Sequence, residues 1–158
     1  MSIKRRELVV RGGLLMLAGE AGLIGVHALF FPWYFYNHFL FGRGWVKMLP
    51  PYNEHITRDL GALYIGFFVV LGYAVLKLSK DLVNGAILGF VAATIPHMIF
   101  HIVHADDAPL LIDRILQVGL LAITVMFGAG LMLLARPLFD DRAPAVSTPT
   151  LDRADALT

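Results

Sequence analysis

Apolar residues dominate four long stretches of the chain, and polar residues gather between them. The stretches cover about residues 8–31, 55–78, 82–104 and 110–135. Each holds about 20 residues or more, the length that an α-helix needs to cross roughly 30 Å of hydrocarbon. Because a backbone in lipid must satisfy its own hydrogen bonds, we expect all four stretches to be helices. The pattern therefore predicts an all-α fold, a four-helix transmembrane bundle formed by residues 1–136.

The composition agrees with a membrane protein of one compact domain. Of 158 residues, 58% are hydrophobic and 16% are charged, against roughly 45–50% and about 25% in soluble domains. From residue 137 onward the sequence turns polar and proline-rich, and we expect 137–158 to be a disordered cytoplasmic tail. The lack of cysteine excludes thiol chemistry and iron–sulfur clusters. A net charge of +1 gives no electrostatic support for nucleic acid as a partner.

Lysine and arginine are more frequent on one side of the predicted helices than on the other. Positive charge gathers in cytoplasmic loops, so this bias predicts that both termini and the connection around Ser79 are cytoplasmic. The 32–54 loop and the 105–109 turn are then outside, in a multi-pass protein of the cell membrane. The N-terminus resembles a signal peptide, but its apolar stretch is too long and no A-x-A-type cleavage site follows, so we predict an uncleaved first helix. Leaving aside Arg153, the cytoplasmic residues are Lys4, Arg5, Arg6, Arg11, Lys77, Lys80, Arg136 and Arg142, and the outer ones are Arg43, Lys47, Arg58 and Arg114.

The loop between the first two predicted helices is unusually aromatic. Because Trp and Tyr prefer the level of the lipid headgroups, we expect this loop to lie on the outer interface, with a short helix near Trp33–Phe41. Two roles stay open for it: a hydrophobic anchor, or a lid over the histidine region. Its aromatic residues are Phe30, Phe31, Trp33, Tyr34, Phe35, Tyr36, Phe39, Phe41, Trp45 and Tyr52.

Histidines form the most distinctive polar pattern in the chain. His97, His101 and His104 are spaced i, i+4 and i+7, which puts them on one face of a helix. At the start of the preceding helix, His55 and Asp59 share a face in the same way. The two helices are consecutive and antiparallel, so both motifs fall at the same membrane level and we expect them to touch. Ionisable groups at membrane depth are costly and usually mark a functional site.

Metal binding is the sharper interpretation of this pattern. Neutral imidazole suits zinc, copper and iron, and carboxylates can complete the shell. The predicted site for a divalent metal or a polar ligand is formed by His55, Asp59, His97 and His101. His104 would lie about 10 Å from His97 along the helix, at the membrane boundary, and is secondary. The sequence does not favour haem b, for which the only support is that His27 and His97 lie at similar depths.

The remaining polar residues of the first two helices have secondary or structural roles in this prediction. Glu54 is a further secondary metal candidate at the start of the second helix. Arg58 can form an internal ion pair with Asp59, and Asn53 is a good N-cap for the same helix. Glu20, in the middle of the first helix, is either a hydrogen-bonding partner for another helix or a proton-relay group. The alternative to a metal or ligand site is that the protein is a structural accessory subunit whose polar residues only stabilise the bundle.

No motif points to an enzyme. The sequence lacks a recognisable Ser-His-Asp set, a phosphate-binding glycine loop and a nucleotide motif, so catalysis is not favoured. Gly85 and Gly89 form a G-x-x-x-G motif that predicts close contact with another helix. The expected partners are the lipid bilayer and either further copies of the chain or a larger membrane complex.

Two sequence runs carry a resemblance to a protein family. The first reads LPPYNEHITRDLGA over residues 49–62, and the second reads PHMIFHIVH over residues 96–104. Together they resemble a family of small four-helix membrane proteins of actinobacterial type. The resemblance covers about residues 30–135 and implies the four-helix topology, but it implies no activity, substrate or cofactor. In helix number and size alone, the chain is also similar to DoxX-like membrane proteins.

Overall fold

The computed structural model describes residues 1–48, 51–108 and 110–140, which are mostly helical with no strand among them. Four of the helices are long and apolar enough to cross a membrane. This confirms the predicted all-α fold with four helices of membrane-spanning length and fits an integral membrane protein. The long helices are α1 (Ile3–Phe30), α3 (Glu54–Lys77), α4 (Lys80–Val103) and α5 (Leu111–Asp140), and the short ones are α2 (Pro32–His38), η1 (Val46–Met48) and η2 (Ala105–Asp107).

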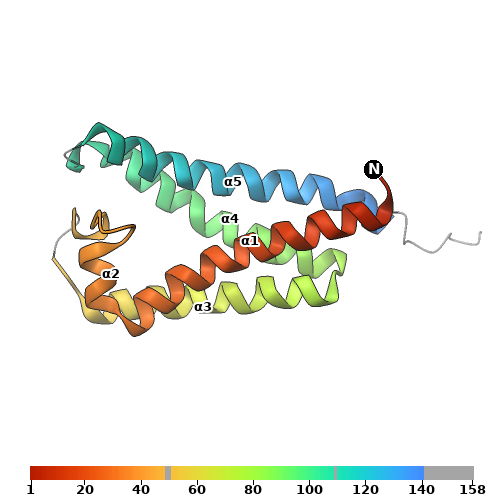
Figure 1. The fold of residues 1–158 in the computed structure, drawn as a ribbon, viewed down its shortest axis with the longest axis horizontal. Coiled ribbons are helices and arrows are strands. Elements are labelled where there is room, and N and C mark those ends of the chain that lie inside the picture. The colour runs from red at the N-terminus through yellow and green to blue at the C-terminus, as the bar shows by residue number, and fades with distance from the viewer. Residues whose placement is uncertain (49–50, 109, 141–158) are drawn as a thin grey trace, which may run out of the picture.

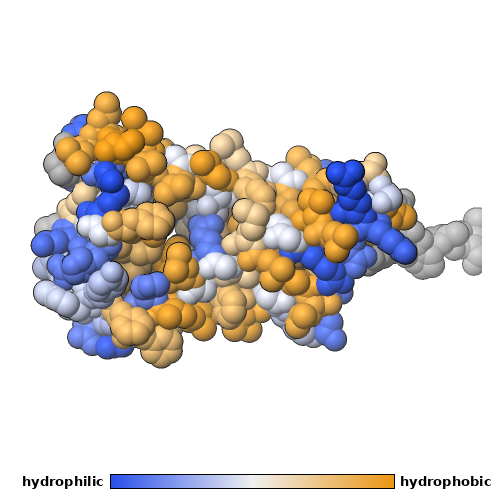
Figure 2. Space-filling model, viewed as in Figure 1, coloured by the Kyte–Doolittle hydropathy of each residue, from blue (hydrophilic) through white to orange (hydrophobic). Residues whose placement is uncertain are grey.

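The long helices form two pairs, α1 with α3 and α4 with α5 (Figure 1). At one end, which we call the termini end, the start of α1, the α3–α4 connection and the end of α5 come together. At the other end, the loop end, α4 and α5 diverge from α1 and α3, and α2 lies there beside the α1–α3 pair. Figure 2 shows hydrophobic surface along most of the length and hydrophilic groups concentrated near both ends, as a membrane-spanning bundle requires.

Local sequence signals explain where the helices begin and end. The Ser2 side chain accepts a hydrogen bond from the backbone N–H of Arg5, and α1 ends at Phe30, just before Pro32 begins α2. Asn53 accepts from the N–H of Ile56 at 3.1 Å, which confirms it as the N-cap of α3. The predicted short helix of the aromatic segment is present as α2.

The last helix is longer than the sequence predicts. The apolar pattern predicted an end near residue 135, yet α5 continues through Pro137 to Asp140. Leu138 is fully buried among residues of the other helices, and burial of such a side chain contributes about 1.5–3 kcal/mol, which offsets the hydrogen bond that proline removes in the final turn. The predicted disordered tail is therefore wrong for residues 137–140, and its remainder, 141–158, lies outside the described residues.

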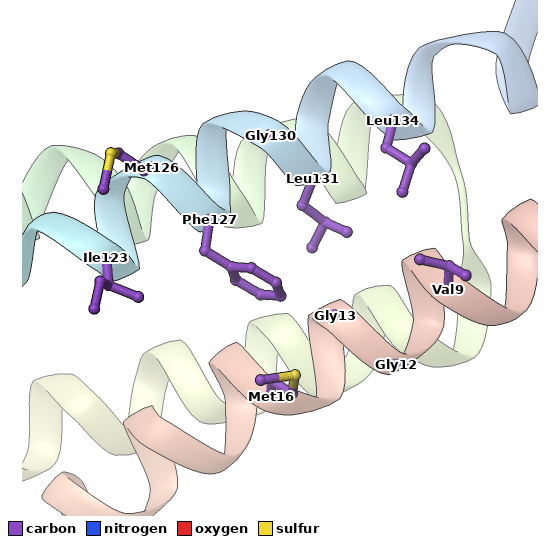
Figure 3. A pocket seen from close by; sticks show the side chains of 10 residues that line it. All are labelled: Val9, Gly12, Gly13, Met16, Ile123, Met126, Phe127, Gly130, Leu131 and Leu134. Atoms are coloured by element: carbon purple, nitrogen blue, oxygen red, sulfur yellow. The ribbon is translucent and has the colours of Figure 1, made fainter. Parts of the chain in front are cut away.

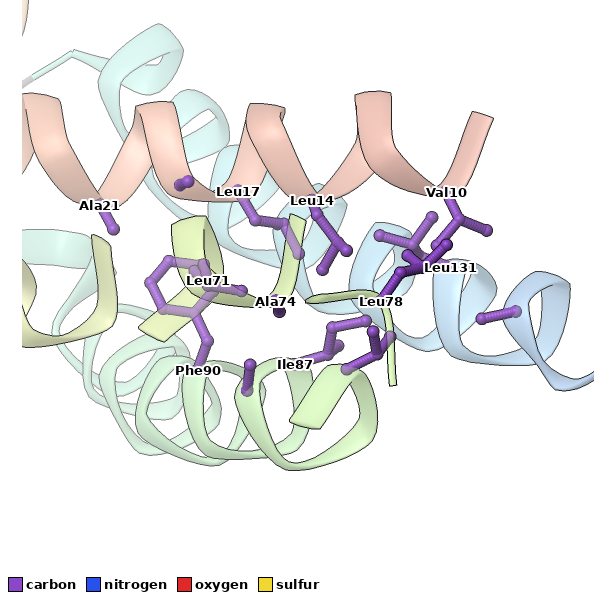
Figure 4. Close-up of a cluster of buried hydrophobic side chains, with 14 of the residues drawn as sticks. Val10, Leu14, Leu17, Ala21, Leu71, Ala74, Leu78, Ile87, Phe90 and Leu131 are labelled. Carbon is purple, nitrogen blue, oxygen red and sulfur yellow. The ribbon is translucent and has the colours of Figure 1, made fainter. Parts of the chain in front are cut away.

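The hydrophobic core draws on all four long helices and lies nearer the termini end (Figure 4). There the apolar faces of the two helix pairs meet, and the side chains point into one shared interior. The largest fully buried members are Leu14 and Leu17 of α1, Leu71 of α3, Ile87 and Phe90 of α4, and Leu138 of α5.

The closest helix approach is between α1 and α3, and glycine makes it possible. A Cβ atom added at Gly61 would lie 2.3 Å from the backbone nitrogen of Leu29, far inside van der Waals contact. The predicted G-x-x-x-G contact does not form. A Cβ added at Gly85 would meet nothing within 4 Å, and at Gly89 it would meet only the Phe67 ring, at 3.8 Å. The motif was misleading because its spacing gives no information on which helix face is covered.

Candidate functional site

Two histidines of α4 form the centre of the candidate site. Pro96 precedes them inside a continuous helix, and the i, i+4 spacing of His97 and His101 brings their Nε2 atoms within 3.0 Å of each other. The Gln117 side chain of α5 is a neighbour of His101, so His101 lies on the side of α4 that faces α5. His101 is half-buried, and His97 is exposed in the isolated chain.

The loop after α2 folds over α5 next to this histidine pair. The indole N–H of Trp45 donates to the Asp113 carboxylate at 2.8 Å, and the Arg43 guanidinium pairs with the same oxygen. One turn along α5, the Gln117 amide donates to the Met48 sulfur at 3.6 Å. The loop thus lies over the loop end of α5 and reaches the neighbour of His101. These contacts hold the loop on α5, and its role as a hydrophobic anchor or as a lid over the histidine region stays a prediction.

A glycine allows the loop to reverse direction. Gly44 has φ +65°, and a Cβ atom added there would lie 2.6 Å from the carbonyl oxygen of Asn37. Only glycine fits this combination of positive φ and close approach. The reversal is closed by a backbone hydrogen bond of 2.7 Å from Trp45 to Phe39, and it buries the Trp45 ring against α5.

The polar residues at the start of α3 form a separate, exposed group. His55 Nε2 lies 3.3 Å from Asp59 Oδ2, and both side chains are largely exposed, at 84% and 65%. The predicted ion pair between Arg58 and Asp59 is wrong. Arg58 pairs with Glu54 at 2.9 Å and also donates to the carbonyl of Leu29 at the end of α1. Arg58 thereby ties α3 to α1, and its pairing with Glu54 occupies a carboxylate that was a secondary metal candidate.

Aromatic side chains connect α2 to the beginning of α3. Tyr52 lies edge-on to Trp33, with ring centroids 5.0 Å apart, and 5.1 Å from the ring of Tyr36. Desolvation and the Glu54 carboxylate raise the pKa of the Tyr52 phenol, against the opposing effect of Arg58. The phenol therefore stays neutral at physiological pH and keeps its hydrogen-bond donor.

The structure does not bring the α3 and α4 motifs together. Among the described residues there is no group of three or more histidine, aspartate or glutamate side chains that could hold a metal ion. Figure 1 shows the reason: the start of α3 and the end of α4 lie at opposite edges of the loop end. Consecutive helices are usually neighbours over their whole length, but here they diverge away from their connection. A metal site shared by His55, Asp59, His97 and His101 is therefore not supported.

The other three histidines are engaged locally. His104 hydrogen-bonds through Nδ1 to the carbonyl of Phe100 and stacks on its ring, with centroids 4.1 Å apart. His27 hydrogen-bonds in the same way to the carbonyl of Leu23, at 2.7 Å. His27 and His38 line one cavity of about 270 Å³ between α1 and the α2 segment. His104 is thus not positioned with the His97–His101 pair.

A second polar contact lies deeper, between α1 and α5. The Thr124 hydroxyl is 3.1 Å from both carboxylate oxygens of Glu20, which makes Glu20 a hydrogen-bonding partner of another helix. The polar face of α5 that contacts Glu20 was not predicted from the sequence. Asp113, Gln117 and Thr124 are spaced i, i+4 and i+11 in a largely apolar helix, and all three are buried. That spacing places them on one face and was visible in the sequence.

Comparisons with protein-family models, with curated proteins and with solved structures find no match for this chain. The family resemblance described above therefore stays a prediction, and the function is argued from the residues themselves.

Proposed function

We propose that this integral membrane protein binds one copper ion at the loop end, with His97 and His101 as its two nitrogen ligands. The observation that carries the proposal is the convergence of their Nε2 atoms to 3.0 Å. With metal–nitrogen bonds of about 2.0–2.1 Å, two ligands of one tetrahedral ion lie roughly 3.4 Å apart. In the hydrogen-bonded pair one Nε2 carries the proton, so binding requires that this ring take its Nδ1–H tautomer and that either imidazole rotate slightly.

Met48 is the third ligand in this proposal. Its sulfur already contacts the Gln117 amide at 3.6 Å, and Gln117 is a neighbour of His101, so one side chain lies between the thioether and that imidazole. Thioether sulfur is a soft ligand that favours copper(I), whereas zinc is more often held by thiolate, imidazole and carboxylate.

The charge of the donor set also favours copper(I). Two imidazoles and a thioether are neutral, and the nearby carboxylate of Asp113 is held by Arg43 and Trp45. A monovalent ion needs less compensating negative charge in a low-dielectric site than a divalent ion does. The proposal therefore narrows the sequence-based choice of zinc, copper or iron to copper in its reduced state.

Metal analysis of the detergent-purified protein tests the proposal. After loading with copper(I) under reducing conditions and removal of excess metal, we expect one copper per chain. The double variant His97→Ala, His101→Ala should retain none, and Met48→Leu should bind more weakly through loss of one ligand. The matched control is His55→Ala, Asp59→Ala, which removes an exposed pair elsewhere and should keep the metal. Wild-type protein that stays metal-free after loading with copper, zinc and iron would refute the proposal.

A structural role is the second candidate, and a specific observation favours it. Among the described residues, every buried side-chain nitrogen and oxygen atom has a hydrogen-bonding partner. Links such as those from Thr124 to Glu20 and from Trp45 to Asp113 join separate helices and loops without any ligand. Under this reading copper leaves the thermal midpoint unchanged, whereas a bound metal raises the midpoint of the wild type alone.

A further inference from the structure

An apolar groove runs between α1 and α5 near the termini end (Figure 3). Its volume is about 680 Å³, within the usual range for a site that holds one small ligand. Figure 3 shows Val9 and Leu134 at one end and Ile123 at the other, with Phe127 pointing from α5 toward α1. The groove lies within two helices of membrane-spanning length, so its natural occupant is a molecule dissolved in the membrane.

Glycines give the groove its depth. A Cβ atom added at Gly12 or Gly130 would meet nothing within 4 Å, so both glycines border open space. Gly13 differs, because a Cβ there would lie 2.6 Å from the Leu131 side chain. Gly12 and Gly130 therefore keep open a space that larger side chains would fill without clashing with their immediate neighbours.

The two ends of the groove differ in chemistry. At the termini end, the Arg6 guanidinium donates to the carbonyl of Leu134, a groove residue, at 3.2 Å. Lys4 and Arg5 precede it and are exposed, so three consecutive cations lie where α1 begins. About 15 Å further along α1 the groove ends near Met16. A cationic end at the membrane surface and an apolar trough below it match a lipid with an anionic headgroup.

We propose that the groove binds one acyl chain of an anionic phospholipid whose phosphate lies against Arg6. The headgroup then lies beside Lys4 and Arg5 at the surface, and the chain runs over Gly12 and Gly130 toward the middle of the membrane. A second copy of the protein is a poorer occupant. Two copies with the same orientation would bring their Lys4–Arg6 clusters to the same level, where like charges repel, whereas a phosphate neutralises them. This inference uses residues at the opposite end from the proposed copper site and stands independently of it.

Native mass spectrometry of the delipidated full-length protein tests the inference. Titration with phosphatidylglycerol and with phosphatidylcholine of identical acyl chains should show one tight site that prefers phosphatidylglycerol by about tenfold. Gly12→Leu and Gly130→Leu, each tested alone, fill the groove and should weaken that site by about tenfold or more. Arg6→Gln should remove the preference for the anionic headgroup while leaving weaker binding of both lipids.

Matched controls separate groove filling from general damage. Gly19→Leu places the same side chain on α1, also where a Cβ meets nothing within 4 Å, but outside the groove. Arg114→Gln removes a cation at the loop end. Both should bind phosphatidylglycerol like the wild type, and helical content by circular dichroism should be unchanged in every variant. Equal affinity for the two lipids, undiminished binding by both groove-filled variants, or protein dimers that exclude lipid would each overturn the inference.

Discussion

Gly61 is the position at which the fold is most sensitive to one added methyl group. The substitution Gly61→Ala would place a Cβ atom 2.3 Å from the backbone nitrogen of Leu29 and 2.7 Å from its Cα. Ordinary van der Waals contact begins near 3.4 Å, so α1 and α3 must separate by about 1 Å. Backbone atoms cannot rotate away as a side-chain end can. The whole interface between the two helices therefore absorbs the change.

The expected effect is large for so small a substitution. Overpacking of a well-filled interior typically costs about 1–3 kcal/mol, and a clash with backbone belongs at the upper end of that range. Alanine also favours the helix over glycine by about 0.5–1 kcal/mol, which offsets a small part of the loss. The net loss should be about 2 kcal/mol, which corresponds to a fall in the thermal midpoint of roughly 4–8 °C for a chain of this size.

Thermal unfolding in detergent, followed by circular dichroism, measures this effect. Gly66→Ala is the matched control, because it lies on the same helix and its added Cβ would meet nothing within 4 Å. The control should be as stable as the wild type or slightly more stable. If Gly61→Ala unfolds at the wild-type midpoint, the close approach of α1 and α3 described above is wrong.

Three further predictions concern other contacts. Thr124→Val removes the hydrogen bond to Glu20 and should cost about 0.6–1.7 kcal/mol by thermal unfolding, whereas Thr94→Val, whose hydroxyl bonds only to its own helix, should cost less. Leu138→Ala should cost about 2–5 kcal/mol, and an effect as small as that of the exposed Leu133→Ala would contradict the packing of the last turn of α5. Asp113→Asn should speed hydrogen exchange in residues 43–48, because Arg43 and Trp45 lose their charged acceptor; the control Asp106→Asn alters an exposed pair and should leave that exchange unchanged.

The helices could be predicted from the sequence because lipid imposes a strict rule on apolar stretches of this length. Asn53 was likewise predictable as a cap, since capping depends only on neighbouring residues. The end of α5 was not, because a local proline signal competed with the burial of Leu138, which depends on the other helices. The Gly85 motif failed for the same reason: its spacing is local, but the partner surface is not.

The candidate site, too, could be predicted only where the signal was local to one helix. The i, i+4 spacing of His97 and His101 correctly predicted that the two imidazoles lie together. Their neighbours were predicted from the usual pairing of consecutive helices, and this choice of α3 was wrong for the loop end. In the structure, the neighbour of His101 is Gln117 of α5, and Met48 of the loop contacts Gln117. Gln117 could have been found from its spacing with Asp113, whereas Met48 depends on a chain reversal that the sequence signals only weakly, through Gly44.

Copper binding at the proposed site should also hold residues 43–48 more firmly on α4 and α5. Met48 contacts α5 in the same short segment in which Arg43 and Trp45 are held by Asp113, so the soft ligand and the loop anchor lie close together in the sequence. A metal ion bound by Met48 and by the histidines of α4 would add a second attachment of this segment to the α4–α5 pair. Copper should therefore slow hydrogen exchange in residues 43–48, and it should partly restore slow exchange in Asp113→Asn. A structural role for the histidines predicts no effect of copper on either protein, so this one measurement separates the two functions.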